Sequence, residues 1–407
     1  MKSVLVFMPD VPYPLSYGGR IEYYNKLRVL KRLYEKVYLV FTYNSAEEVE
    51  IFQEEANKLC DDYICWPRNK SFSRAFHFKP YYAISCLPNS REKNRLELFV
   101  LKYITEISLI VCDQPHMYEV VKVVKDIIKI NKMDIPVVYR KHNNEARFMF
   151  DQFISSKKIS LRPYFFAAEA FRMWWYEQYI HKNSNCILCV SQKENQKMLN
   201  QGLVSYWIPI AYRVYNEAYL DLSTIEEKKV YKYLQEKCSN NKVIYFCSSF
   251  HGGFNVNLVH WFVESVLPII RREIPNTIFL FGGGKAKEYF QYRREENILV
   301  FSDVKSIKPY IKIADMSLVL TKSRAGVKLK LIESLFYKKK VVSTVEGVMG
   351  SGLDEILPNT NDSQKFAQYC IDVLVNNVNY EEIWMTYQNI YSSKSIEEKY
   401  ASVLNNL

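Results

Sequence analysis

Long apolar runs are absent from this chain, and none approaches the eighteen or so residues that cross a membrane as a helix. The first eight residues, MKSVLVFM, meet a proline at once and carry no small-residue cleavage site, which predicts a first β-strand rather than a signal peptide. We therefore expect a cytoplasmic protein, either free or at the inner face of the plasma membrane.

The cysteines do not have the spacing of a disulfide framework. The nine cysteines are scattered, and the CxxC pair Cys186 and Cys189 lies in a strand-like run. A strand places these two residues on opposite faces, which does not suit chelation of a metal ion. We expect nine reduced thiols, as in an intracellular protein. Internal repeats and low-complexity tracts are also absent from the sequence.

Positive charge is in excess, with a formal net charge of +11. Such a surface suits nucleic acid, anionic lipid or substrates that carry phosphate. The most lopsided segment is 66–95, in which seven Lys/Arg accompany a single acid, Glu92, among aromatic residues. This mixture fits a solvated loop whose rings fold inward, a membrane-surface patch or a site for single-stranded nucleic acid. We favour the first two and expect no nucleic-acid partner.

The length of 407 residues and an apolar fraction of 48% predict a globular protein with two domains. Short apolar runs alternate with helical patterns, as in crossover units of a parallel sheet. The first alternation predicts strands at 3–8, 37–42, 108–112, 136–140 and 186–190, and helices at 20–34, 91–103 and 117–130. The second predicts strands at 243–247, 277–281, 298–301, 316–320 and 340–343, and helices at 256–272, 286–291, 306–313 and 328–337.

These patterns predict an α/β protein with two doubly wound domains. The first domain is expected at 1–208, a charged linker at 209–240, the second domain at 241–378 and tail helices at 379–407. Ligands of such sheets bind beyond the carboxyl ends of the strands, and two facing domains of this kind form a cleft. The loops at those strand ends therefore carry the candidate site residues.

In the first domain, Gly18 and Gly19 stand at a helix start, where glycine lets the backbone approach a ligand and leaves N–H groups open to an anion. The loop does not match GxGxxG, so we expect no dinucleotide; a tight turn with packing glycines is the alternative. Arg140 and His142 follow one strand, and His116 follows another. Each histidine is either a ligand-facing group or a structural one.

The second domain has glycines after its strands, Gly252 and Gly253 after the first and Gly283 after the next. They keep the backbone open to a phosphate. A further loop begins at Thr344, beyond the strand predicted at 340–343.

The segment 324–348, RAGVKLKLIESLFYKKKVVSTVEGV, combines a glycine loop, two lysines and a lone acid. Gly326 is expected at a helix start with Lys328 and Lys330 in the first turn, where positive charge opposes the helix dipole unless an anion offsets it. Glu333 lies three residues after Lys330 on the same helix face, where a carboxylate suits the two hydroxyls of a ribose. The segment predicts a nucleotide site; an exposed Lys–Glu pair is the alternative.

The order of these pieces resembles the GT-B glycosyltransferases, specifically the retaining family 4 group. PYPLSYGG is similar to that family's entry loop, VVYRKHNNEA to its strand–Arg–x–His–Asn segment, and CILCVSQKE and WIPIAY to the strand and link that follow. NVNLVHWFVESVLPIIRREIPNTIFLFGGG and RAGVKLKLIESLFYKKKVVSTVEGVMG resemble motifs of the second domain, the latter most specifically. The resemblance spans nearly the whole chain.

This resemblance implies two Rossmann-like domains that face a cleft, with the tail helices returning to the first domain. It implies transfer of a sugar from a nucleotide-sugar to an acceptor hydroxyl, with retention at the anomeric carbon. The expected catalytic residues are Lys330, Lys328 and His142. The residues expected to hold the donor nucleotide are Glu333, Gly326, Gly252, Gly253, Gly283 and Thr344. The acceptor side is expected to include Gly18, Gly19, His116 and Arg140.

Departures from the family pattern occur at three places. Ala325 stands where many relatives have the first of two glutamates, Ala211 replaces an asparagine, and a strong arginine is missing from the turn that begins at Cys247. Phosphate binding is therefore assigned to the lysines. The acidic pair Asp61-Asp62 lies outside the expected site loops, so we expect neither a metal ion nor another cofactor.

The expected partners are a nucleotide-sugar and a glycan or lipid-linked acceptor, as in the assembly of bacterial capsule, O-antigen or lipopolysaccharide, with contact to anionic membrane through 66–95. A nonenzymatic glycosyltransferase-like subunit and a GT-B sugar-nucleotide epimerase are the alternatives to a transferase.

Overall fold

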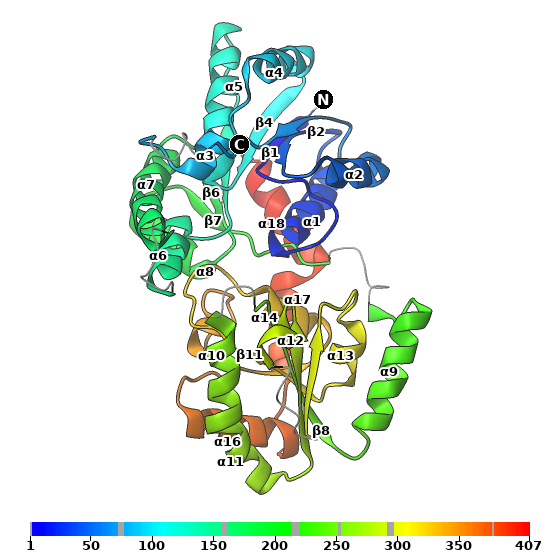
Figure 1. Cartoon of the computed structure of the whole chain (residues 1–407). Helices are drawn as coiled ribbons and strands as arrows, with labels where there is room; N and C mark the ends of the chain where they lie inside the picture. Colours follow the sequence, from blue (N-terminus) through cyan, green and yellow to red (C-terminus); the bar gives the residue numbers. More distant parts are fainter. Residues whose placement is uncertain are drawn as a thin grey trace. The chain divides into compact units, whose positions relative to one another are not determined.

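A computed structural model describes residues 2–71, 77–155, 162–213, 220–250, 254–290, 297–376 and 378–407. The chain divides into two compact units, each built on one parallel sheet (Figure 1). Unit 1 comprises Met1–Tyr215 and Tyr391–Leu407, and unit 2 comprises Asn216–Ile390. In these ranges, no helix combines the length and the apolar character that crossing a membrane requires.

The sheet of unit 1 has the strand order β3-β2-β1-β4-β5-β6-β7. The strands are β1 Ser3–Met8, β2 Lys36–Tyr43, β3 Asp62–Pro67, β4 Ile107–Asp113, β5 Val137–Lys141, β6 Cys186–Cys189 and β7 Ser205–Trp207. Successive residues of β1 enter different cores: Leu5 and Phe7 pack in one apolar cluster, and Val4 and Val6 pack in the other. The sheet is thus covered on both faces, as parallel strands require.

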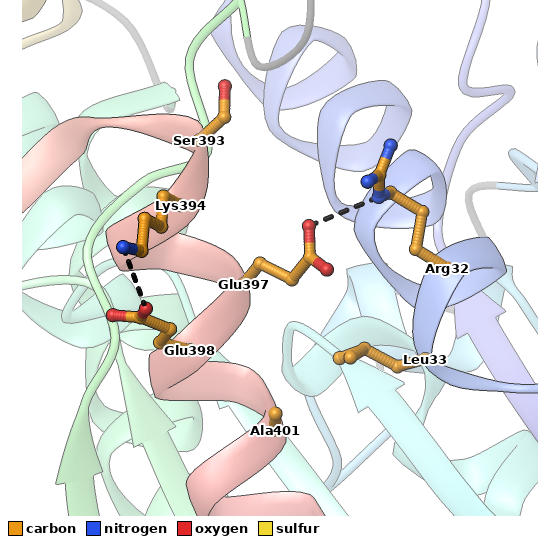
Figure 2. A pocket seen from close by; sticks show the side chains of 7 residues that line it. All are labelled: Arg32, Leu33, Ser393, Lys394, Glu397, Glu398 and Ala401. Atoms are coloured by element: carbon orange, nitrogen blue, oxygen red, sulfur yellow. Dashed lines mark ion pairs between the residues drawn. The ribbon is translucent and has the colours of Figure 1, made fainter.

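Helices connect these strands. They are α1 Gly18–Leu33, α2 Ala46–Leu59, α3 Tyr81–Ser85, α4 Ser90–Tyr103, η2 Pro115–Met117, α5 Tyr118–Ile130, α6 Glu145–Ser155, α7 Arg162–Lys182 and α8 Gln192–Asn200. The C-terminal helix α18, Ser393–Leu404, returns to this unit and packs beside α1. A groove of about 450 Å³ separates the two helices, and its charged residues pair across and along it: Arg32 Nε with Glu397 Oε2 at 3.1 Å, and Lys394 Nζ with Glu398 Oε1 at 3.8 Å (Figure 2).

The sheet of unit 2 has the order β10-β9-β8-β11-β12. Its strands are β8 Lys242–Cys247, β9 Thr277–Gly283, β10 Ile298–Ser302, β11 Met316–Val319 and β12 Lys340–Ser343. Its helices are α9 Ile225–Lys237, α10 Phe254–Trp261, η4 Phe262–Val266, α11 Leu267–Glu273, α12 Ala286–Phe290, α13 Lys308–Ile313, α14 Leu329–Phe336, α15 Val345–Val348, α16 Ser363–Val375 and α17 Glu381–Tyr391.

The predicted α/β class and its two doubly wound parallel sheets are confirmed. Strands β3 and β7 and the helices α6 and α7 were not predicted. The predicted helix 256–272 is interrupted by η4, which is a π-helical turn. Pro268 stands at the start of the next helix, α11, and cannot donate the helical hydrogen bond to the preceding turn, which accounts for the interruption.

Candidate functional site

The strand order of unit 2 reverses between β8 and β11, which makes these neighbours the switch point of the sheet. Their pairing covers only Met316↔Ile244 and Ser317↔Tyr245, so the strands continue unpaired toward their carboxyl ends. The crevice outside the strand ends at a switch point is where open α/β sheets bind ligands. This place in unit 2 is therefore the first candidate site.

Lys330, in the first turn of α14, occupies this place. Its Nζ donates to Ser248 Oγ at 3.3 Å and to the Leu320 carbonyl at 2.9 Å, so the ammonium bridges the residues that follow β8 and β11. It also lies 5.0 Å from the centre of the Phe246 ring. Burial, together with the nearby charge of Lys328, lowers the pKa of Lys330 to about 8. Ser248, Leu320 and the Phe246 ring are all neutral, so none of these partners balances the charge of the ammonium.

Lys328 differs from its sequence expectation. Helix α14 begins at Leu329, and Lys328 is its N-cap residue with extended backbone, so the prediction of Lys328 in the first turn is wrong. Its Nζ donates to the carbonyls of Ala325 and Gly326. Gly326 has a φ of +61°, a conformation that favours glycine. Lys328 therefore fastens the loop that leads into α14.

Glu333 lies one turn after Lys330 on α14 and is partly buried. Burial, together with the negative charge of Glu333, raises the pKa of the neighbouring Cys247 thiol to about 11. Glu333 and Lys330 thus both face the end of β8, as the predicted shared helix face requires.

Gly283 lies at the end of β9, beside the same strand end. It has a φ of +132°, and a Cβ added there would lie 2.0 Å from the Ser248 carbonyl oxygen. Only glycine fits, because the backbone approaches the residue that holds Lys330. Gly252 and Gly253, predicted to bind the donor, lie outside the described residues.

Thr344 fastens the loop after β11. Its Oγ1 donates to the Thr321 carbonyl at 2.8 Å and accepts from the Thr321 N–H at 3.1 Å. The side chain is buried, so Thr344 shapes the loop around Leu320 through these two bonds.

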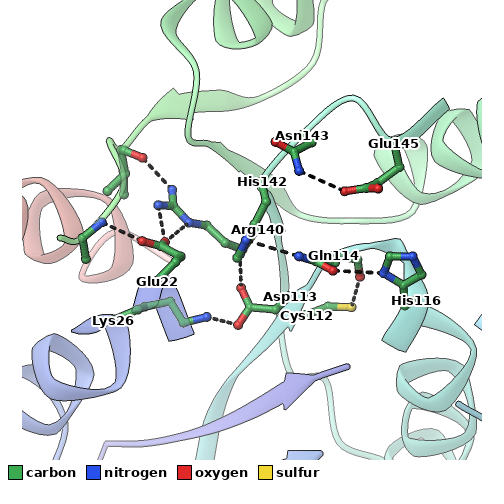
Figure 3. A network of polar contacts seen from close by, with 12 residues as sticks. Glu22, Lys26, Cys112, Asp113, Gln114, His116, Arg140, His142, Asn143 and Glu145 are labelled. Carbon is green, nitrogen blue, oxygen red and sulfur yellow. Dashed lines mark hydrogen bonds and ion pairs between the residues drawn. The ribbon is translucent and has the colours of Figure 1, made fainter. Parts of the chain in front are cut away.

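The switch point of unit 1 lies between β1 and β4, and a buried polar network follows β4 (Figure 3). Lys26 and Asp113 form a fully buried ion pair. Asp113 Oδ1 also lies 3.1 Å from His142 Nε2. Burial lowers the pKa of His142 well below its ordinary value, as do the charges of Lys26 and Arg140. The neutral ring then donates through Nε2 to Asp113.

The network continues toward a pocket. His142 Nδ1 faces Gln114 Nε2 at 3.4 Å, and Gln114 Oε1 faces His116 Nδ1 at 3.0 Å. Gln114 has a φ of +59°, a strained conformation that the surrounding structure must hold. Such strain is found at functional sites, and here it turns the amide between two histidines.

The pocket has a volume of about 240 Å³. It is lined by Pro9, Asp10, Tyr17, Tyr23, Arg68, Tyr82, Gln114, His116, Glu145, Phe148 and Met149. Burial, together with the charge of Arg68, lowers the pKa of His116 to about 3. Burial, together with the charge of Glu177, raises the pKa of Glu145 to about 7. The pocket therefore offers a neutral histidine, a half-ionised carboxyl, the guanidinium of Arg68 and aromatic faces.

Arg140 does not line this pocket. It is fully buried, and its guanidinium donates to Glu22 Oε1 at 2.6 Å and to the carbonyls of Ile208 and Pro209 at 2.6 and 3.0 Å. Tyr400 of α18 packs over it. These contacts tie β5, α1 and the chain after β7 together.

Gly18 and Gly19 begin α1, as predicted. A Cβ at Gly19 would lie 2.7 Å from the Tyr17 ring. The Tyr17 hydroxyl donates to Asp10 Oδ2 at 2.6 Å, which holds the ring over the helix start. Gly19 therefore leaves space for the Tyr17 ring. Both glycines follow Tyr17, which lines the pocket.

The acidic pair Asp61-Asp62 forms ion pairs with lysines of unit 1. Asp61 pairs with Lys31 at 2.8 Å, and Asp62 pairs with Lys102 at 3.2 Å. Over the described ranges, no group of three or more His, Cys, Asp or Glu could hold a metal ion.

Segment 66–95 is described except for residues 72–76. Trp66 is buried and donates to the Cys86 carbonyl, and Lys79 pairs with Glu119 at 2.7 Å. Phe78 is 98% exposed.

Most of these contacts escaped sequence reasoning. Glu22, Lys26 and Asp113 carry no motif, and only the fold shows that they are buried together. The acid at the end of the apolar run LIVCD, Asp113, is a signal that could have pointed to this network, because a charge in such a run must be paired when it is buried.

The chain is similar to one protein family and to several known proteins. Residues 241–376 match the family model of Glycosyl transferases group 1. A protein of Klebsiella pneumoniae, described as an uncharacterized 44.6 kDa protein in cps region, is 24% identical over 415 residues, which cover 97% of this chain and 98% of that protein. HepE of Anabaena has a TM-score of 0.64 at 12% identity, covering 100% of both chains. A glycosyltransferase of Rickettsia africae has a TM-score of 0.61 at 16% identity, covering 99% of this chain and 98% of that one.

The fold and the family match together point to one class of protein. The structure has the GT-B fold, and residues 241–376 match the family of glycosyl transferases group 1. The resemblance found in the sequence is confirmed to this extent.

Proposed function

We propose that the protein transfers a sugar from a nucleoside diphosphate sugar to a hydroxyl of a glycan or lipid-linked acceptor. The observation that carries the proposal is the ammonium of Lys330, which bridges the ends of β8 and β11 and whose partners Ser248 and Leu320 are neutral. A cation held at a switch point with neutral partners suits an anion, and the diphosphate of the donor supplies one.

Glu333 lies one turn further along α14, where its carboxylate can accept from the hydroxyls of the donor ribose. Gly283 and Gly326 keep the adjoining backbone close to the ligand. HepE, which shares the fold, has been crystallised with UDP and with UDP-glucose, which supports a uridine donor as the first to test.

The proposed reaction proceeds with retention and without a metal ion. The bond between the anomeric carbon and the diphosphate oxygen breaks, and the bond from the acceptor oxygen forms on the same face. The acceptor proton passes to the departing diphosphate. Lys330 stabilises the charge that grows on that diphosphate, which is the role a metal ion has in other phosphate sites.

On the acceptor side, we assign the 240 Å³ pocket beside Gly18 and Gly19 to the acceptor sugar. His116 lies in the pocket wall, and His142 positions it through Gln114. Arg140 is left out of this assignment because its guanidinium is buried against Glu22 and the carbonyls of Ile208 and Pro209. The Klebsiella relative from a cps region and the fold shared with the lipopolysaccharide outer core galactosyltransferase WaaB (TM-score 0.58, 12% identity) support a role in surface polysaccharide assembly.

A donor screen tests the proposal. UDP-, GDP-, ADP- and CDP-sugars are compared by thermal shift, and release of nucleoside diphosphate is followed for each. A donor present at 100 times its Kd stabilises the fold by about 2.7 kcal/mol. We expect one base to give a clear shift and slow hydrolysis. Absence of both with every donor contradicts the proposal.

A further inference from the structure

Helix α7 of unit 1 exposes a row of large aromatic side chains. Phe171 and Trp175 are each 68% exposed, Trp174 is 51% exposed, and Tyr164 and Tyr179 are also exposed. At 100° per residue, Tyr164, Phe171 and Trp175 lie within roughly 20° of one line along the helix. The row therefore forms one continuous face.

The opposite face of α7 is apolar as well. Met173, Tyr176 and Ile180 are buried in the core of unit 1. A helix that is hydrophobic all round is normally covered on all sides, and exposed apolar faces of this size mark an interaction surface.

The charges of α7 are arranged unevenly around this face. Both of its acids are buried: Glu169 pairs with Arg172 at 2.7 Å, and Glu177 pairs with Lys141 at 2.6 Å. Lys182 ends the helix exposed. From α5, Lys122 lies 5.1 Å from the centre of the Tyr179 ring and pairs with Glu119 at 3.4 Å. The aromatic row of α7 is thus bordered by the exposed Lys182 and the paired Lys122, and both carboxylates of α7 itself are buried.

Helix α6 adds exposed apolar side chains beside α7. The two helices lie side by side (Figure 1) and pack through Met149, Phe166 and Ala170. Phe150 and Ile154 of α6 are exposed, and Phe148 is both exposed and part of the pocket wall.

We propose that this aromatic face docks the protein onto an anionic lipid bilayer. The face is defined by Phe150, Ile154, Phe171, Trp174, Trp175 and Tyr179. Tryptophan and tyrosine rings settle at the headgroup level, apolar side chains enter the acyl boundary, and the bordering lysines meet anionic headgroups. Docking goes beyond the proposed reaction and would hold unit 1 at the membrane, where a lipid-linked acceptor is found.

This face is a second candidate beside segment 66–95, whose membrane contact stays a prediction from the sequence. In that segment Phe78 is 98% exposed, whereas Trp66 is buried and Lys79 pairs with Glu119.

The experiment is flotation of the full-length protein with vesicles of phosphatidylcholine alone or with about 30% phosphatidylglycerol. The test variant is Trp174→Ala/Trp175→Ala, and the matched control replaces two exposed apolar residues elsewhere, Leu98→Ala/Tyr233→Ala. We expect the wild type and the control to float with anionic vesicles, and the tryptophan variant to lose at least tenfold in partition coefficient. The blue shift of tryptophan emission on vesicle addition should be lost in the same variant.

Three results would overturn the proposal. They are no flotation of the wild type, equal flotation of wild type and tryptophan variant, and a concentration-dependent dimer that the tryptophan variant loses while vesicles go unbound. Circular dichroism and melting verify that the variants are folded. Donor hydrolysis, measured on the same proteins, separates failure of docking from failure of the proposed reaction, since Trp174 and Trp175 are not part of the donor site.

Discussion

Replacement of Lys330 by alanine tests the donor site most directly. The ammonium bridges Ser248 and Leu320, so the variant removes the cation at the β8/β11 switch point without touching Glu333. Because charge on the diphosphate grows as the glycosidic bond breaks, the cation contributes more in the transition state than in the bound ground state. We therefore expect kcat to fall more than the donor KM rises.

The magnitude follows from two observations. Loss of one preorganised group that stabilises a developing oxyanion costs about 2.7–4 kcal/mol, or roughly 10²–10³ in kcat. The pKa of Lys330, lowered to about 8 by burial, also gives the wild type a pH dependence. The ammonium is about nine-tenths populated at pH 7 and about one-tenth at pH 9, so kcat/KM for the donor should fall about tenfold between them. Lys330→Ala should lack this decline.

Lys339 provides the matched control. Burial lowers its pKa to about 8 as well, and its Nζ donates to the carbonyls of Lys312 and Ala314 at 2.8 and 2.7 Å. It lies at the amino end of β12, whereas Lys330 lies at the carboxyl ends of the strands of the same sheet. Lys339→Ala thus loses a comparable buried lysine, with hydrogen bonds worth about 0.5–1.5 kcal/mol each, but no group of the proposed site.

The assay is steady-state release of nucleoside diphosphate from the cognate donor at several pH values, with melting of each variant alongside. Near-normal kcat in Lys330→Ala refutes the reasoning, as does an equal loss in Lys339→Ala. A decline above pH 8 that persists in Lys330→Ala assigns the titration to another group.

Three further outcomes are expected. Glu333→Ala should weaken nucleoside diphosphate binding by roughly 1.5–3 kcal/mol in calorimetry, the range for a hydrogen bond to a charged group, and unchanged affinity would remove Glu333 from the ribose. Activity should survive EDTA, because Lys330 meets the diphosphate; a strict need for Mg²⁺ or Mn²⁺ would show that the phosphate site is misassigned. The acceptor KM should fall as pH rises through about 7, where Glu145 ionises and becomes a hydrogen-bond acceptor, and Glu145→Gln should flatten that profile.

The fold was predictable because most strands of both sheets are short apolar runs that can be recognised from the local sequence. Runs such as Val4 to Met8 are buried on both faces and read as continuous apolar strands, and glycines mark the strand ends. Helix α7 escaped prediction because it is apolar all round, so no helical period of polar residues stands out. The short edge strand β7 escaped because three residues carry too little pattern.

The site was predictable only in part. Lys330 and Glu333 are adjacent on one helix, so local spacing placed them correctly on one face. The start of α14 was misjudged by one residue, and this moved Lys328 from the helix into the cap. The partners of His142 could not be predicted, because Asp113 and Lys26 reach it only through the order of the strands and no local spacing relates them.

The two switch points differ in how their buried charges are paired, and this difference supports the proposed division of the ligands. In unit 1, Asp113 is paired with Lys26 and bonded to His142, so the charge behind the pocket is already balanced. Leaving one of two buried partners unpaired costs about 3–5 kcal/mol, so a ligand charge has no place in that balance. The pocket in front of this network offers a neutral histidine, the carboxyl of Glu145, the guanidinium of Arg68 and aromatic faces, which suit the hydroxyls and the apolar side of a sugar. In unit 2, the partners of Lys330 are neutral, so a diphosphate is the ligand that would balance its charge. We therefore propose that the donor binds unit 2 and the acceptor sugar binds unit 1.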